Sequence, residues 1–156
     1  MENKSEAIYK ARQYAFLLLK FRPRSTQEIC ARLKKKKFAP QTIQETIFFL
    51  EDKDFLNDRD FAKSWMEFRL KKPFGLRRIK EELNLKGIDP EIIDETIAEI
   101  KKDYTEEDIV AGLAQARWSK LKGIDSQKAK QRIFGYLMRR GFSPEVVVNA
   151  LGQLVK

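Results

Sequence analysis

One apolar pattern occurs three times along this chain, and it restricts the fold more than any other feature of the sequence. Its first copy consists of Ile29, Leu33, Phe38, Pro40, Ile43 and Ile47. Adding 50 to each number gives Ile79, Leu83, Ile88, Pro90, Ile93 and Ile97, and adding a further 54 gives Ile133, Leu137, Phe142, Pro144, Val147 and Leu151. Because periods of this length are typical of stacked helical units, the pattern predicts tandem copies of one structural unit.

Each copy is predicted to contain three helices, because its apolar residues recur at spacings of three and four. In the first copy, helices are expected from about Ser5 to Phe21, after a capping box that begins at Ser25, and from Pro40, a residue favoured at the first helical position. No stretch shows the sustained alternation that a half-buried strand requires. The expected fold class is all-α, with three tandem three-helix repeats at residues 1–54, 55–103 and 104–156.

The end of the second helix is expected to differ between copies. The second and third copies have Gly87 and Gly141 at this point, and glycine readily takes the positive φ that ends many helices. The first copy has Lys37 instead, which predicts a different helix stop there.

Some large or reactive side chains are expected in the core. Phe61, Trp65 and Phe68 are expected to form one inward stripe, and Ala116 is placed on the inner face of its helix with Ile109 and Leu113. The single cysteine, Cys30, is expected to be a small buried filler rather than a reactive thiol. Trp118 lies among basic residues, and both a core and a contact role remain open for it.

The basic charge predicts a polyanionic partner. The net charge is +9 and the pI is near 9.6, which favours nucleic acid, a nucleoprotein or an acidic protein surface over ordinary solubility charge. Residues 1–54 hold 12 basic and 7 acidic residues (+5), residues 55–103 hold 11 of each (0), and residues 104–156 hold 9 and 5 (+4). Basic residues collect on the second helices and at their ends, and the run Lys34–Lys37 is interpreted as a contact surface rather than only a solvated helix end.

The same sequence argues against an enzyme. It has no histidine, which removes the commonest general base and metal ligand, and one cysteine alone excludes ordinary zinc sites. No glycine-rich phosphate-binding signature is present. The acidic residues lie at expected helix starts and surfaces. No catalytic residue, metal or cofactor is therefore expected.

The single cysteine and the absence of any long apolar segment predict a cytoplasmic protein that makes no membrane contact. The N-terminal apolar run Ala15–Leu19 is too short for a secretory signal.

Three segments carry a resemblance to a known family. They are AFLLLKFRPRSTQEICARLKKKKF near the start, FLNDRDFAKSWMEFRL followed by GLRRIKEELNLKGID in the middle, and LMRRGFSPEVV near the end. With these segments the chain resembles the bacterial RecX regulatory proteins, which modulate the RecA recombinase. The resemblance implies tandem three-helix repeats in an elongated, curved molecule that acts as a monomer.

The resemblance also implies a function. A protein of this family is expected to bind within the helical groove of the RecA–DNA filament and to inhibit ATP hydrolysis, strand exchange and co-protease activity, or to shorten filaments. DNA recombination, DNA repair and the SOS response would be affected in turn. The alternative that the basic helices leave open is an autonomous protein that binds single- or double-stranded DNA without sequence specificity, through salt-dependent phosphate contacts.

The candidate partner-binding residues are exposed basic side chains in the matching motifs and in the lysine run. They are Lys34, Lys35, Arg69, Arg77, Arg78, Lys86, Arg139 and Arg140.

Overall fold

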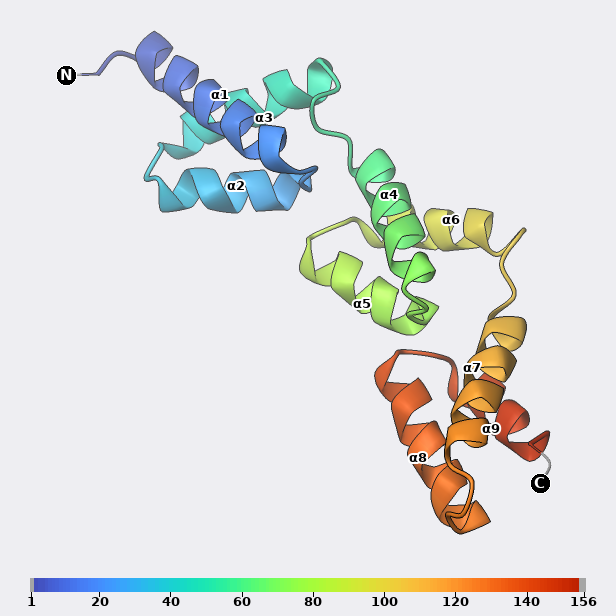
Figure 1. Cartoon of the computed structure of the whole chain (residues 1–156). Helices are drawn as coiled ribbons and strands as arrows, with labels where there is room; N and C mark the ends of the chain where they lie inside the picture. The colour runs from blue at the N-terminus through green and yellow to red at the C-terminus, as the bar shows by residue number, and fades with distance from the viewer. Residues whose placement is uncertain (1, 155–156) are drawn as a thin grey trace. The chain divides into compact units, whose positions relative to one another are not determined.

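The computed structural model describes residues 2–154, and within that range the chain forms nine α-helices and no strand (Figure 1). The helices are α1 (Lys4–Phe21), α2 (Thr26–Lys35), α3 (Pro40–Asp52), α4 (Asp58–Lys71), α5 (Leu76–Leu85), α6 (Pro90–Ile100), α7 (Glu106–Lys120), α8 (Ser126–Arg139) and α9 (Pro144–Gly152). The predicted all-α fold with three three-helix repeats is confirmed.

Local sequence signals define where the helices begin. The predicted capping box is present at α2, where Ser25 Oγ accepts a hydrogen bond from the Glu28 amide and the Glu28 carboxylate accepts one from the Ser25 amide. The helix α1 has a second such box, which Asn3 and Glu6 form. The third helix of each repeat begins at a proline. Proline has no amide hydrogen, and at the first helical position an amide hydrogen would have no partner within the helix.

The three second helices end in the same way. The amide of the second residue after the stop donates to a carbonyl five residues earlier: Phe38 to Leu33, Ile88 to Leu83 and Phe142 to Leu137. The residue before it has a positive φ of 67° at Lys37, 75° at Gly87 and 87° at Gly141. The prediction of a different stop in the first repeat is therefore wrong, because Lys37 adopts the backbone conformation that glycine adopts in the other two.

The described chain divides into two compact units. The first comprises the residues up to Ser64 together with Leu83–Ile93, and the second comprises Trp65–Glu82 together with the residues from Asp94 onward. In the first unit, α1 packs on α2 and α3, and α2 packs on α3. Ala11, Ala15, Leu18, Ile29, Leu33, Ile43, Leu50 and Leu56 form its buried core. Apolar residues spaced by three and four thus face inward, as the repeat pattern predicts.

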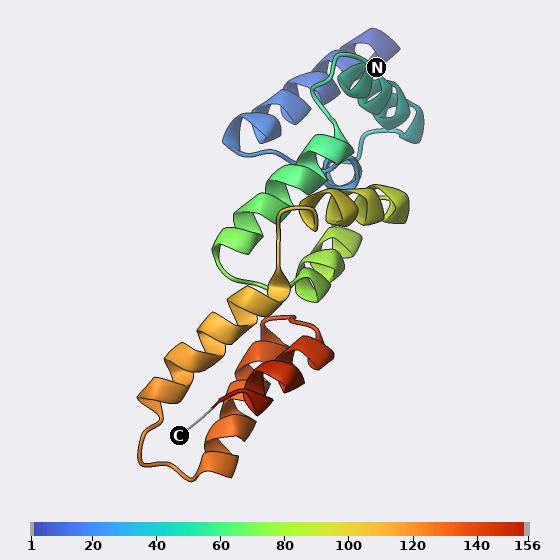
Figure 2. The same cartoon turned by 90° about the vertical axis from the view of Figure 1, so that its right-hand side faces the viewer.

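In the second unit, α7, α8 and α9 pack on one another, with α7 and α8 side by side (Figure 2). Their buried core consists of Val110, Ala114, Ile133, Leu137, Phe142, Val147, Ala150 and Leu154. Trp118 packs against this core, which answers the open question about its role in favour of packing.

Three packing predictions need correction. Phe68 is 50% exposed, although Phe61 on the same helix is buried. Ala116 is exposed, since α7 turns Val110 and Ala114 inward instead. Cys30 is half-buried rather than buried, because it packs against the core of the first unit while its outer edge lines a surface groove. In each case helical periodicity predicts which side of a helix faces inward, but not how many residues on that side are buried.

Candidate interaction surface

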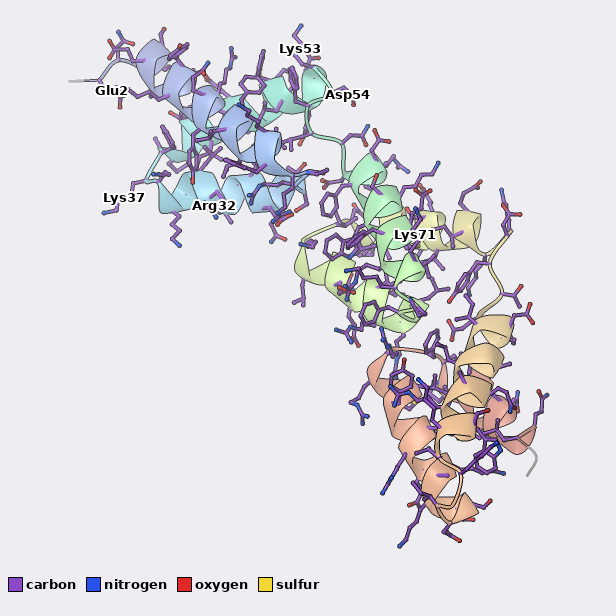
Figure 3. All side chains as sticks on the ribbon, viewed as in Figure 1. Glu2, Arg32, Lys37, Lys53, Asp54 and Lys71 are labelled. Atoms are coloured by element: carbon purple, nitrogen blue, oxygen red, sulfur yellow. The ribbon has the colours of Figure 1, made fainter. Side chains whose placement is uncertain are left out.

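The predicted lysines at the end of α2 lie on the surface. Lys34 and Lys35 are exposed in the last turn of the helix, and basic residues there complement the negative end of the helix dipole. Within the described residues, neither side chain makes a hydrogen bond or an ion pair. Figure 3 shows the neighbouring Lys37 side chain pointing outward at this end. These lysines remain accessible for a partner.

Arg69, in contrast, is committed to contacts within the chain. Its side chain is 15% exposed, and its Nε lies 2.9 Å from Glu82 Oε1 in an ion pair. Its guanidinium also lies 3.9 Å from the centroid of the Phe74 ring and 5.8 Å from that of Trp65. These contacts hold the end of α4 against α5, so Arg69 has a structural role.

Arg77 and Arg78 bind the end of a distant helix. Arg77 Nη2 donates to the Met138 carbonyl at 3.1 Å, and Arg78 Nη1 donates to the Arg139 carbonyl at 3.1 Å. The last carbonyls of a helix have no partner inside the helix. The first turn of α5 therefore caps the C-terminus of α8, where positive charge also complements the helix dipole.

Arg140 contributes to the same contact from the α8 side. We call such a contact, between the start of one second helix and the end of the second helix in the next repeat, a joint. Its Nη1 donates to the Lys72 carbonyl at 2.9 Å, and its own carbonyl accepts from the Gly75 amide at 2.8 Å. Its neighbour Arg139 is exposed. Arg140 is thus a packing residue as well as a basic one.

Phe74 is the centre of a cluster of arginines in the second unit. The guanidinium carbons of Arg69, Arg78 and Arg140 lie 3.9, 4.4 and 4.6 Å from its ring centroid. Each such contact contributes about 0.5–2 kcal/mol, depending on how far it is desolvated. We call these four residues the Phe74 cluster. The repulsion between the three guanidinium groups is offset by the Phe74 ring, by Glu82 and by the carbonyls that accept hydrogen bonds from Arg78 and Arg140.

An equivalent joint joins α2 to the end of α5 in the first unit. Ser25 Oγ donates to the Lys86 carbonyl at 2.7 Å, just as the Gly75 amide donates to the Arg140 carbonyl. In the repeat register, position 25 corresponds to 75 and position 86 to 140. Lys86 Nζ lies 3.6 Å from Glu28 Oε2, so this lysine is committed to the joint too.

Glu28 connects the cap of α2 with this joint. Burial by itself would raise the pKa of the Glu28 carboxyl, but hydrogen bonds from Arg22 and from the Ser25 amide, together with the charge of Lys86, hold it below its usual range. The carboxylate is therefore ionised at neutral pH and serves as the acidic partner of two basic residues.

The structure separates the eight predicted residues into two groups. Lys34, Lys35 and Arg139 are exposed, and their side chains make no hydrogen bond or ion pair with any residue that the structure describes. Arg77 is exposed while it caps α8. Arg69, Arg78, Lys86 and Arg140 are half-buried in the joints. Two aromatic residues that contact arginines, Phe74 and Tyr136, were not among the predicted residues. The guanidinium of Arg117 lies 3.5 Å from the centroid of the Tyr136 ring. The signal that points to them is an aromatic residue between basic ones.

The described residues contain no group of three His, Cys, Asp or Glu side chains that could hold a metal ion. A groove of about 730 Å³ in the second unit is lined by both acidic and basic residues, and it includes Tyr104, whose pKa is raised by burial and by Glu106 and Glu107. In residues 2–154 no helix is long and apolar enough to cross a membrane.

Comparison with known proteins identifies the family. Three tandem three-helix domains first define the class, which is an all-α helical-repeat protein. The first, second and third three-helix domains of RecX match residues 11–50, 57–97 and 105–151. The chain is 32% identical over 140 residues to regulatory protein RecX from Mannheimia succiniciproducens, which covers 89% of this chain and 90% of that protein. The chain belongs to the RecX family.

Two further comparisons agree with this assignment. Regulatory protein RecX from Pasteurella multocida is 31% identical over 143 residues, covering 91% of this chain and 86% of the relative. The crystal structure of RecX from Lactobacillus salivarius superposes with a TM-score of 0.84 at 23% identity, covering 96% of this chain and 97% of that one. The latter similarity shows the shared fold.

Proposed function

We infer that this protein is a cytoplasmic modulator of the RecA recombinase, which binds the RecA–DNA filament and inhibits ATP hydrolysis, strand exchange and co-protease activity. Recombination, repair and the SOS response would change as a consequence. The observation that carries the proposal is the match to regulatory RecX proteins over about nine-tenths of both chains. The exposed basic residues support it, because a RecA–DNA filament presents phosphates to any protein that binds it.

The residues proposed for this contact are the exposed ones, two in each compact unit, rather than the half-buried Arg69, Arg78, Lys86 and Arg140. Lys34 and Lys35 lie at the end of α2, whereas Arg77 and Arg139 lie at the joint of α5 and α8. Lysine acts as a flexible point charge, whereas arginine can form two parallel hydrogen bonds to one phosphate. Such contacts recognise backbone charge and shape without reading base sequence.

The test is the single-stranded-DNA-dependent ATPase of RecA, measured with increasing amounts of this protein. We expect ATP hydrolysis to fall and the protein to co-sediment with filaments. Unchanged hydrolysis together with no binding to filaments at micromolar excess would remove the proposal.

A second measurement separates filament binding from autonomous DNA binding. The affinity for naked single- and double-stranded DNA is compared with the affinity for RecA filaments at equal salt. Filament binding predicts a clear preference for filaments, whereas an autonomous DNA-binding protein would bind naked DNA at least as tightly.

A pair of charge-reversal variants tests the surface. Lys34→Glu with Lys35→Glu is expected to raise the concentration for half-inhibition about tenfold, or about 1.4 kcal/mol of binding free energy. Lys101→Glu with Lys102→Glu is the matched control, since both lysines are exposed and the net charge falls equally. Equal loss in both variants would show that only the net charge matters.

A further inference from the structure

The first unit has an apolar groove that the basic joints do not use. It lies between α2 and α3, has a volume of about 490 Å³ and is lined by Cys30, Lys34, Phe38, Pro40, Ile43, Gln44 and Ile47. One charged side chain, Lys34, stands among these residues. The groove is therefore apolar in its floor and positive at one edge.

A large aromatic side chain extends this apolar surface. Phe48 is 71% exposed, and it follows Gln44 by one helical turn on the same face of α3. Burying such a side chain against a partner is favourable because it removes apolar surface from water. Aromatic residues, phenylalanine among them, are enriched in protein–protein interfaces relative to the rest of the surface.

The second repeat shows that the scaffold does not require these residues, and the third agrees at position 48. In the repeat register Phe48 corresponds to Ala98 and Gly152, so packing places no demand for an aromatic at this position. Cys30 and Gln44 correspond to Lys80 and Asp94 in the second repeat, where the two side chains form an ion pair at 3.5 Å. A charged pair thus occupies, in the second repeat, the place of the apolar groove in the first.

Charge identifies the kind of partner. Lys35, Lys36 and Lys37 continue from Lys34 at the end of α2, and all four are exposed. No acidic residue lines the groove. An apolar groove between two helices can accept an amphipathic helix, which places residues spaced by three, four and seven into it.

We propose that the groove between α2 and α3 docks an acidic amphipathic helix of a protein partner, with its apolar face on Cys30, Ile47 and Phe48 and its carboxylates toward Lys34–Lys37. This inference goes beyond the proposed function, since it does not require that the partner be the filament. Phosphate contacts use charge alone, whereas this site needs apolar and acidic residues together.

The probe is a fluorescein-labelled synthetic peptide of about 18 residues, long enough to hold some helix in water, with leucines at i, i+3 and i+7 and glutamates at the polar positions. Its anisotropy is measured with the full-length protein. We expect saturable binding that is lost when the leucines are replaced by serine or the glutamates by lysine. Binding of the serine peptide as tight as that of the leucine peptide would overturn the proposal.

Variants of the protein test the location. Phe48→Ala, which installs the residue of the second repeat, and the double variant Cys30→Lys with Gln44→Asp, which installs its ion pair, should each weaken peptide binding at least about tenfold. Phe21→Ala is the control, because Phe21 is 76% exposed and outside the groove. Circular dichroism establishes that each variant is folded. Folded variants that bind within twofold of the original protein would overturn the proposal.

Cys30 provides an independent readout because it is the only cysteine of the chain. Its alkylation rate by iodoacetamide should fall severalfold when the leucine peptide is bound. Unchanged alkylation at saturation would place the peptide elsewhere. Equal protection by oligo(dT) would identify a nucleic-acid surface instead, and protection that grows with protein concentration, along with a dimer in sedimentation, would identify self-association. Each of these results contradicts the proposal.

Discussion

At the scale of single residues, the positions that end the second helices differ in what surrounds them. All three have positive φ, but a Cβ at Gly141 would meet the backbone and Cβ of Arg78. At Gly87 it would meet the flexible side chain of Gln27. Lys37 ends the second helix of the first repeat and is exposed. This explains why a lysine is tolerated at one stop and a glycine is needed at another.

We therefore expect Gly141→Ala to lower the free energy of unfolding by about 2–4 kcal/mol, combining roughly 1–2 kcal/mol for left-handed backbone with the cost of displacing Arg78. Chemical denaturation of the full chain measures it. Gly123→Ala is the matched control, with φ of 87° and no atom within 4 Å of the added Cβ, so it should cost only about 1–2 kcal/mol. Equal losses would show that the close approach is not limiting.

Glu28 gives a pH-dependent prediction at the same scale. Its folded pKa is depressed, so its stabilisation is present above the unfolded pKa and is lost as pH falls through the folded pKa. Glu28→Gln should therefore lower the melting temperature near neutral pH, by an amount equivalent to about 1 kcal/mol, and this difference should shrink as pH falls through the folded pKa of Glu28. Thermal melts of both proteins across pH test this. A difference that does not depend on pH would assign the effect to packing.

At the scale of helices, residues at the start of α2 and of α5 pair with carbonyls at the end of the second helix in the following repeat. Arg77 and Arg78 satisfy carbonyls at the end of α8, and Ser25 satisfies one at the end of α5. Helix ends buried without partners are unfavourable because each unpaired polar group costs about 1–3 kcal/mol. The basic residues of α5 thus have a structural reason to be there, independent of any partner.

Arg78→Ala is accordingly expected to destabilise the second unit by about 1–3 kcal/mol, through a lost charge-assisted hydrogen bond and lost stacking on Phe74. Arg139→Ala, an exposed arginine next to the same joint, should change stability by less than about 0.5 kcal/mol. Denaturant melts of the two variants decide between them. Charge reversal at Arg78 is for this reason a poor test of partner binding, because it would also disturb the fold. If both variants were equally stable, Arg78 would have no structural role, and its charge reversal would again be a valid test of binding.

At the scale of the whole molecule, the net charge of +9 predicts binding that depends strongly on salt. If the four accessible basic residues contact phosphates, the logarithm of the affinity should fall with the logarithm of salt with a slope of about −3. Between about 50 mM and about 200 mM salt, filament binding would weaken by roughly 50-fold.

The same measurement on the Lys34→Glu, Lys35→Glu variant should give a slope shallower by about 1.5–2, because two phosphate contacts are removed. An unchanged slope would exclude these lysines from the phosphate contacts. Binding of the leucine peptide to the groove should depend less on salt, since part of its free energy is apolar.

The sequence by itself predicted the three three-helix repeats and the capping box at Ser25, because helices and their caps depend on residues within about four positions of each other and the repeat is visible as a recurring apolar pattern. It also indicated the family, since the matching motifs are contiguous. Phe68 and Ala116 were misplaced because periodicity does not define how wide an inner face is. Only the tertiary structure decided which basic residues remain accessible. Arg77 and Arg78 meet carbonyls 61 residues away, and no local pattern records such a contact.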